Sequence, residues 1–355
     1  MDLLLASIFL GIVPMTLYAF VIWRIDRWEK EPFHLMAAAF LWGCIPAVIL
    51  AIIAQTIFEI PIGNFSNGDA FLGELIQASI AAPVTEEITK GLGLALIFLI
   101  FRREIDSILD GLIYGSMIGF GFSAIEDVLY FSSESTGGGL LALFFLRTFL
   151  FGMLHAFFTG LTGVGFALSK FSDRPVMKIL WPILGLAAAM LTHGLHNYFA
   201  TMGEEHILMA VGGVSLGMLW FIATIAICLY HENRWIRIHL SEEVANGVLY
   251  AEQALETSHF WSRSSLSILS KGYRSFISRK KLLHQATELA YEKQRHLRKG
   301  SGSRPDSLAR LEALRAEVKE LSQNDPLIVS GKMAGSRVLP PPLPPVRRKP
   351  PPLPS

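Results

Sequence analysis

The hydrophobic positions of this chain fall into seven long apolar blocks separated by short polar segments. A helix that crosses a bilayer needs about 20 mostly apolar residues, and each block is long enough. The pattern therefore predicts an all-α polytopic membrane protein with about seven transmembrane helices, and Pro83 predicts a break or bend in the third. The blocks cover residues 3–23, 34–58, 71–101, 109–131, 140–168, 176–200 and 206–230.

Basic residues occur in every second loop between these blocks. Lys and Arg are present in loops 24–33, 102–108 and 169–175, whereas loops 59–70, 132–139 and 201–205 contain none. Short cytoplasmic loops are enriched in Lys and Arg. The alternation therefore predicts that the N-terminus lies outside and the C-terminus lies in the cytoplasm.

Composition separates two unlike parts of the chain. Only 17% of the residues are charged, against about 25% in soluble domains. The net charge of +1 is a cancellation, because residues 1–230 carry a net −8 and residues 231–355 a net +9. The two cysteines are too few for a disulfide framework or a cysteine-based zinc site. We therefore expect a transmembrane domain over 1–230, followed by a basic cytoplasmic tail that is partly helical and partly disordered.

The tail itself divides into three predicted segments. Residues 231–300 form a basic segment that either lies on anionic lipid or folds into small helices packed beneath the membrane domain. Residues 301–324 comprise most of a flexible Gly-Ser linker at 300–303 and a predicted short helix over 305–322 that docks a partner or pairs with itself. Residues 325–355 are Pro-rich and predict a disordered tail, or alternatively a PxxP-type ligand for a cytoplasmic partner. The apolar stripe of the short helix comprises Leu308, Leu311, Leu314, Val318 and Leu321.

Ionisable residues inside the predicted spans are unusually numerous. A charge at mid-membrane costs at least ~2.5–3.5 kcal/mol, so such residues usually serve function. At ~1.5 Å of rise per residue, Glu86, Glu126 and His193 lie roughly 8–10 Å from the outer face of their spans. The spacing therefore predicts a polar site in the outer half of the membrane. The set comprises Glu86, Glu87, Lys90, Glu126, Asp127, Arg147, His155, His193 and His196.

Carboxylates and imidazoles on facing helices have the ligand types of a divalent metal such as zinc. We assign Glu126, His155 and His193 as metal ligands, and Glu86 or Glu87 as the general base that activates water. A metal-free variant, in which a glutamate activates water directly, stays open. No HExxH motif is present, which excludes an ordinary zincin. Supporting roles are assigned to Lys90, Phe122, Arg147 and Asn197.

Purely structural roles for these residues, and other functions of the protein, are alternatives to this assignment. A single buried Glu–Lys pair or histidine is often structural, and His196 and Asp127 are expected to be peripheral. The same buried acids and histidines would also suit a proton- or ion-coupled transporter, although no internal repeat between the two halves supports this. A catalytically inactive protein that binds transmembrane segments is a third reading.

Four ordered motifs resemble those of the PrsW intramembrane proteases, which are similar to the CAAX-type membrane proteases. Glu86-Glu87-Ile88-Thr89-Lys90 resembles EExxK, Phe122 to Glu126 resembles FxxxE, Arg147 and His155 resemble the third block, and His193 to Asn197 resembles HxxxD with Asn in place of Asp. The resemblance covers about residues 80–200.

This resemblance implies peptide-bond hydrolysis in or beside the bilayer of a bacterial inner membrane. The substrate would be a membrane protein, for example a signalling protein under regulatory proteolysis, and no nucleic acid is expected as a partner. Glu86 and Glu87 would be the catalytic carboxylates, and Glu126, His155 and His193 the other catalytic residues. A divalent metal, zinc in the first instance, is the implied cofactor.

Overall fold

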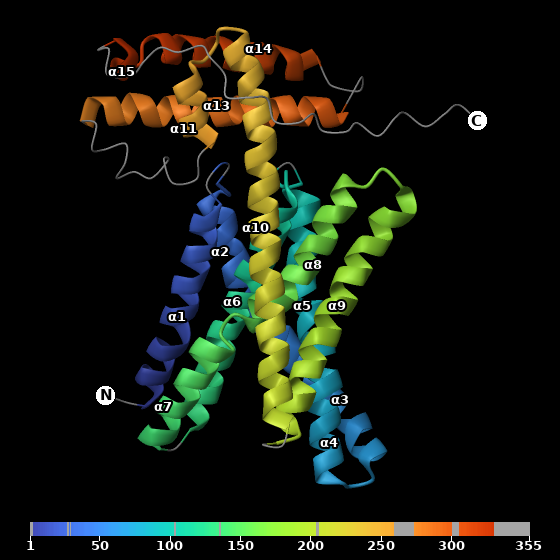
Figure 1. The fold of residues 1–355 in the computed structure, drawn as a ribbon. Helices are drawn as coiled ribbons and strands as arrows, with labels where there is room; N and C mark the ends of the chain where they lie inside the picture. The colour runs from blue at the N-terminus through green and yellow to red at the C-terminus, as the bar shows by residue number, and fades with distance from the viewer. Residues whose placement is uncertain are drawn as a thin grey trace. The chain divides into compact units, whose positions relative to one another are not determined.

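All regular secondary structure in the described part of the chain is helical (Figure 1). The computed structural model describes residues 3–26, 28, 30–102, 104–134, 136–203, 206–258, 273–299 and 305–329. The predicted all-α class is therefore confirmed. The α-helices are α1 (Leu3–Ile25), α2 (Phe33–Trp42), α3 (Val48–Ser66), α4 (Ala70–Ile76), α5 (Ala82–Ile100), α6 (Ile108–Ser133), α7 (Gly137–Phe145), α8 (Leu154–Phe171), α9 (Pro175–Thr201), α10 (Ile207–Ala245), α11 (Ala251–Ser258), α13 (Tyr273–Lys299), α14 (Pro305–Gln323) and α15 (Pro326–Val329).

The chain divides into two compact units, which we call the membrane unit and the tail unit. The membrane unit comprises residues 1–26 and 30–228, and the tail unit comprises residues 27–29 and 229–355. Helix α10 passes through the boundary, so its first part belongs to the membrane unit and its remainder to the tail unit. Each unit is described by itself below.

Six helical stretches of the described chain are long and apolar enough to cross a membrane. Five of the seven predicted blocks match such stretches in the membrane unit, and the last block matches the start of α10. The third block forms α4 and α5, whose apolar run is interrupted by Glu86, Glu87 and Lys90. A polytopic membrane protein is confirmed, whereas seven spans and their orientation stay predictions.

Three π-helical turns interrupt helices of the membrane unit: η1 (Gly43–Ala47), η2 (Gln77–Ala81) and η3 (Leu146–Leu150). Turn η2 leads directly into α5, where Pro83 occupies the first turn. This is the irregularity that Pro83 predicts, although it takes the form of a π-turn rather than a sharp break. Such turns occur frequently at functional sites, and η2 and η3 both contribute residues to the cavity described below.

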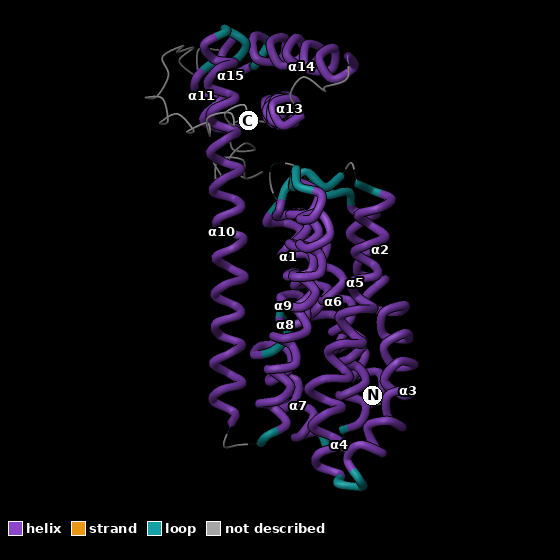
Figure 2. The backbone as a smooth tube through the Cα atoms, turned by 90° about the vertical axis from the view of Figure 1, so that its right-hand side faces the viewer, coloured by secondary structure: helices purple, strands orange, loops and turns teal. Residues whose placement is uncertain are grey.

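Helix α6 forms the centre of the membrane unit and is buried along most of its length (Figure 2). It begins with a capping box, in which Ser107 Oγ accepts from the Asp110 N–H and Asp110 Oδ2 accepts from the Ser107 N–H. Gly119 lies so close to α8 that a Cβ there would overlap the carbonyl oxygen of His155. The glycines of α6 therefore allow the close helix approach that their sequence predicts, and they bring Glu126 level with His155.

The tail unit has a hydrophobic core of its own. Trp28, Ile236, Leu240, Leu282 and Leu289 are buried in it, and α13 and α14 lie side by side (Figure 1). The apolar stripe of α14 corrects the prediction of a docking or self-pairing helix, because four of its five residues pack into this core: Leu311, Leu314, Val318 and Leu321.

Several predicted tail features lie outside the described residues. These are the Gly-Ser linker at 300–303 and the part of the Pro-rich segment 325–355 from residue 330 onward. The prediction of disorder is wrong for the start of that segment, because Pro326–Val329 form α15 and Asp325 bonds Arg279. The basic segment contains the helices α11 and α13, and both of its alternatives, lying on anionic lipid or packing beneath the membrane domain, stay predictions.

Candidate active site

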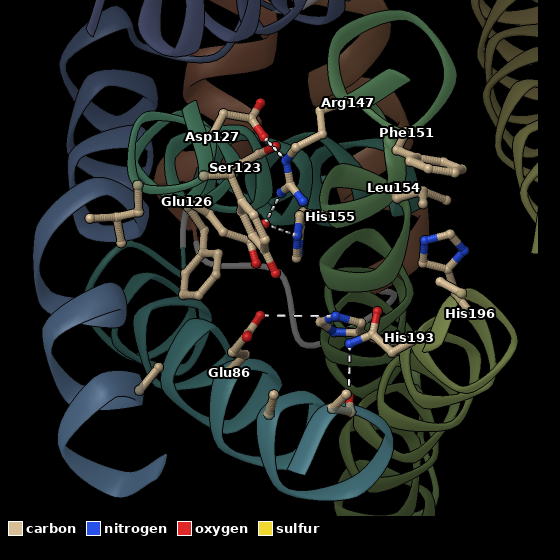
Figure 3. Close-up of a pocket in the computed structure, with 18 of the residues that line it drawn as sticks. Glu86, Ser123, Glu126, Asp127, Arg147, Phe151, Leu154, His155, His193 and His196 are labelled. Atoms are coloured by element: carbon tan, nitrogen blue, oxygen red, sulfur yellow. Dashed lines mark hydrogen bonds and ion pairs between the residues drawn. The ribbon is translucent and has the colours of Figure 1, made fainter. Parts of the chain in front are cut away.

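A cavity of about 540 Å³ lies among the helices of the membrane unit (Figure 3). Part of its wall is apolar and includes Ile52, Leu129 and Phe158, while Glu86 and His193 contribute polar groups. The wall residues come from α3, α4, η2, α5, α6, α7, η3, α8 and α9, together with the short link before α8. The cavity thus combines an apolar lining, suited to a membrane-embedded chain, with reactive groups.

Glu86, His155 and His193 converge on the wall of this cavity (Figure 3). One ligand-type atom from each lies within 4.8 Å of the others. Glu86 comes from the second turn of α5, His155 from the first turn of α8, and His193 from the last third of α9. Three helices that are distant in sequence therefore supply one carboxylate and two imidazoles to one point.

Each of the two histidines also contacts a second carboxylate. His193 Nδ1 lies 3.1 Å from Glu87 Oε1, and His155 Nε2 lies 2.9 Å from Glu126 Oε2. The other nitrogen of His193, Nε2, is 3.9 Å from Glu86 Oε2. Metal-binding histidines commonly donate their second N–H to a carboxylate, which fixes the ring. One carboxylate and two imidazoles supported in this way fit a divalent cation such as zinc.

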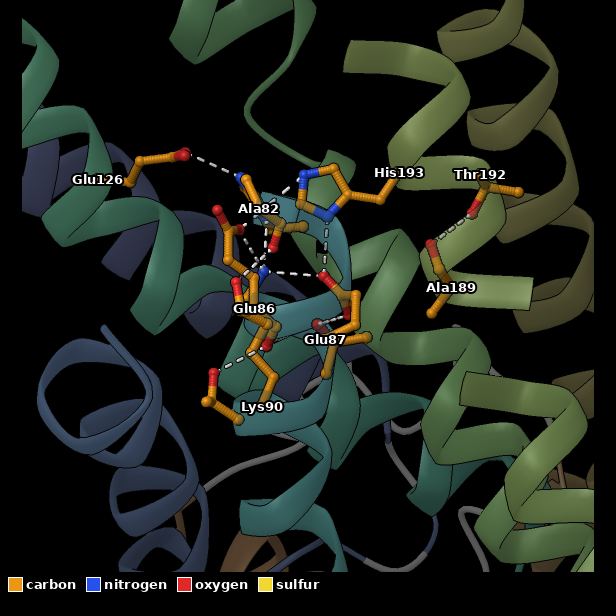
Figure 4. Close-up of polar contacts among 12 residues, drawn as sticks. Ala82, Glu86, Glu87, Lys90, Glu126, Ala189, Thr192 and His193 are labelled. Atoms are coloured by element: carbon orange, nitrogen blue, oxygen red, sulfur yellow. Dashed lines mark hydrogen bonds and ion pairs between the residues drawn. The ribbon is translucent and has the colours of Figure 1, made fainter. Parts of the chain in front are cut away.

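The ammonium group of Lys90 lies between the paired glutamates (Figure 4). Lys90 Nζ donates to Glu87 Oε1 at 2.9 Å and to Glu86 Oε2 at 3.3 Å. It also donates to His155 Nδ1 at 2.9 Å, which leaves the proton of that neutral ring on Nε2, facing Glu126. The lysine, fully buried and over the ring of Phe122 at 3.8 Å, therefore balances two carboxylates that are otherwise costly to bury.

Glu126 and Asp127 share Arg147 as their basic partner (Figure 3). Arg147 Nη2 donates to Glu126 Oε2 and Arg147 Nε to Asp127 Oδ1, both at 2.5 Å. The guanidinium also lies over the ring of Tyr130, 3.9 Å from its centroid. The structure thus groups Glu86, rather than Glu126, with the two histidines. The assignment of Glu126 as a metal ligand stays a prediction.

The remaining predicted residues lie around this centre. Phe122 contacts the ring of His155, with centroids 5.4 Å apart. Asn197 Nδ2 donates to the carbonyl of Ala78 in η2 at 2.9 Å and so binds main chain rather than a site side chain. His196 lines the cavity but packs against Phe151, away from the cluster, as its position in the sequence predicts.

Two residues at the site were not singled out from the sequence. Gln55 Nε2 donates to Glu86 Oε1 at 3.3 Å, and Thr159 Oγ1 donates to Glu87 Oε2 at 3.2 Å. Gln55 is a polar side chain inside an apolar block, and Thr159 lies one helical turn after His155. Both signals are available in the sequence, but polar residues of this kind commonly bond only to their own helix.

Comparison with known proteins identifies the family of this chain. The model of a family described as PrsW family intramembrane metalloprotease matches residues 31–228. Protease PrsW of Bacillus subtilis strain 168 is 22% identical over 196 residues, which cover 55% of this chain and 83% of that protein. Protease PrsW of Clostridioides difficile strain 630 is 27% identical over 190 residues, covering 53% and 76%.

A third relative, Protease PrsW of Oceanobacillus iheyensis, is 26% identical over 224 residues, covering 63% of this chain and 95% of that protein. No solved structure was found to match. The family match spans more than half of the chain, including every residue of the cavity cluster. This chain therefore belongs to the PrsW family of intramembrane metalloproteases.

Proposed function

We propose that this intramembrane protease hydrolyses a peptide bond within a transmembrane segment, using a glutamate to activate water beside a zinc ion. Glu86, His155 and His193 would hold the ion. The observation that carries the proposal is their convergence within 4.8 Å on the cavity wall, with a carboxylate behind each histidine. Family membership supports metal-dependent proteolysis over the transporter reading of the same residues.

The residues around the cluster have separable roles. When bound, the ion would supply Lewis acidity to a water and to the scissile carbonyl. Glu87 is fully enclosed, with its oxygens bonded to Lys90, His193 and Thr159, so it orients His193 and has no access to water. The hydrogen bond from Lys90 to His155 Nδ1 must break before that nitrogen can bind the ion, because the hydrogen bond and the metal bond use the same lone pair of Nδ1.

Glu126 is the carboxylate that we assign as general base. It lines the cavity, and its side chain is 20% exposed, whereas that of Glu87 is 0% exposed. Arg147 and His155 hold it beside the cluster. Glu126 accepts a proton from the attacking water and returns it to the leaving amine. This reverses the expected roles of Glu86 and Glu126.

Metal content and cleavage together test this division of roles. Glu126→Gln should retain the metal of the purified protein, measured by plasma mass spectrometry, and lose cleavage of a co-purified transmembrane substrate. Glu86→Gln should lose both metal and cleavage. The opposite pattern, with metal lost only in Glu126→Gln, would restore Glu126 as ligand and Glu86 as base. Full cleavage by both variants would contradict glutamate-activated hydrolysis altogether.

The substrate is proposed to be a membrane-bound regulatory protein of a bacterial inner membrane, and the tail is proposed to recruit a cytoplasmic partner. The resemblance of the four motifs supports the first statement, and the Pro-rich sequence after residue 330 supports the second. Membrane proteomics of cells carrying the parent chain or Glu86→Ala tests the substrate class. Full-length membrane proteins should accumulate in the variant, and identical profiles would indicate a protein that binds transmembrane segments without cleaving them.

A further inference from the structure

One part of the cavity wall, beside the cluster of Glu86, His155 and His193, is made by η2 and α9. Its main chain is fixed at two points. Asn197 Nδ2 donates to the carbonyl of Ala78, and Gly194 approaches so closely that a Cβ there would be 2.5 Å from the carbonyl oxygen of Ser79. Helix α9 therefore holds the main chain of η2, the turn that contains Gln77.

Two side chains of this wall have buried polar atoms without a partner. Gln77 Oε1 and His196 Nδ1 make no hydrogen bond within the described part of the chain, and both residues line the cavity. They are the sequence neighbours of Ala78 and Asn197, the pair that joins η2 to α9. Figure 3 shows His196 to one side of His193, beside Phe151. Buried polar atoms are rarely left unpaired, and each exception calls for an explanation such as strain, a catalytic role or a bound group.

The ligand chemistry follows from what must enter the cavity. A transmembrane helix has to unwind before one of its peptide bonds can reach the Glu86 cluster. Unwinding releases main-chain N–H and C=O groups, which in the bilayer have no water to bond. A carboxamide offers one acceptor and two donors, so a single Gln can bond both kinds of group. Extended peptides are often bound in this way, through their main chain.

We propose that Gln77 and His196 form a binding site for the unwound main chain of the substrate, beside the cluster and separate from it. Gln77 Oε1 accepts from a substrate N–H, and the His196 ring bonds a second main-chain group. This inference rests on the proposed function, because it takes a transmembrane segment as the substrate. The inference adds that this part of the wall recognises the main chain of the substrate and tolerates different substrate side chains.

The test uses binding, so that it does not depend on turnover. The probe is a synthetic Leu/Ala transmembrane peptide of about 25 residues with a central Gly-Ser-Gly and a fluorophore. Its Kd is measured by anisotropy on the full chain in detergent, in the Glu126→Gln background. Gln77→Leu should weaken binding about five- to ten-fold, the range expected for one hydrogen bond. Gln285→Leu, the same substitution in the tail unit, should leave Kd unchanged.

Backbone esters distinguish a direct bond from a structural effect. An ester in place of one central amide removes a single N–H from the peptide. At one position the ester should weaken binding to the Gln77-containing chain about as much as Gln77→Leu does, and this loss should disappear in the Gln77→Leu chain. His196→Phe, which keeps a ring against Phe151, is a second variant. It should also weaken peptide binding and abolish the ester effect at one position.

An unchanged Kd in Gln77→Leu, ester losses of equal size in both chains, or no binding of the peptide to the Glu126→Gln chain would overturn the inference. Cleavage of the same peptide by the unsubstituted chain is scored separately. Cleavage without coupling between Gln77 and the ester refutes this inference and leaves the proposed function standing. Coupling without cleavage refutes the proposed function alone.

Discussion

The two units of this protein both bury charged side chains, but they enclose them differently. In the tail unit, the fully buried Arg279 donates through Nε and Nη2 to Glu256 and through Nη1 to Asp325. Gln253 Nε2 also donates to Asp325 Oδ2, at 2.9 Å. This network joins α11, α13 and the residue before α15, and none of its side chains lines the cavity of the membrane unit.

In the membrane unit, the Glu86, Glu87 and Lys90 network borders a cavity of about 540 Å³ and also holds two histidines. Within the described residues, Gln77, Asp127 and His196 around that cavity each have one buried polar atom without a hydrogen-bond partner, as do Arg237 and Glu252 in the tail unit. The comparison shows that buried charge alone does not identify a reactive site. A charged network enclosed among helices stabilises their packing, whereas one that borders a cavity keeps its charged groups within reach of a ligand.

The largest expected effect is on chemistry in the membrane unit. His193→Ala removes a proposed metal ligand and should lower the cleavage rate by about 10³-fold or more, because Lewis-acid stabilisation is worth several kcal/mol. Cleavage of a reconstituted transmembrane substrate measures it. Glu59→Ala, an exposed acidic residue on α3, is the control and should cleave normally. Activity in His193→Ala close to that of the control would remove His193 from the site.

The second effect is on stability in the tail unit. Arg279→Met removes the guanidinium that bonds both the Glu256 and the Asp325 carboxylates, and breaking this buried network should cost about 3–5 kcal/mol. Hydrogen exchange of α11 and α13 should accelerate, while cleavage by detergent-solubilised protein stays near that of the parent. Lys281→Met, on the same helix with a side chain 57% exposed, should change exchange little. Loss of cleavage with unchanged exchange would make this network functional rather than structural.

The smallest expected effect is on metal affinity in the membrane unit. Glu87 bonds Nδ1 of His193, the ring nitrogen that faces away from Glu86, and so orients the ring. Glu87→Gln should therefore weaken metal affinity by about 10–100-fold without abolishing binding. Competition with a calibrated chelator measures the affinity. Glu59→Gln again provides the matched control. Complete loss of metal would instead place Glu87 among the direct ligands, and unchanged affinity would show that it acts only through Lys90.

Much of the site was predictable because the membrane makes polar residues conspicuous. Glu86, Glu126 and His193 were placed at one depth by counting residues along three helices, and the structure brings their side chains around one cavity. The apolar stripe on α14 was also predicted, but the prediction of an external partner or a second copy was wrong, because the stripe packs into the core of the tail unit. Periodicity shows which face is buried and not what covers it.

The apolar blocks, the depth of the ionisable residues and the four ordered motifs follow from the chain's order of residues, since bilayer thickness and helical rise convert sequence position into depth. Which carboxylate joins the two histidines depends on how each helix is rotated about its axis. That rotation is set by close contacts such as Gly119 against His155 and Gly194 against η2. Gln55 and Gln77 reach the cavity for the same reason, because side-chain direction depends on packing between helices that are distant in the sequence.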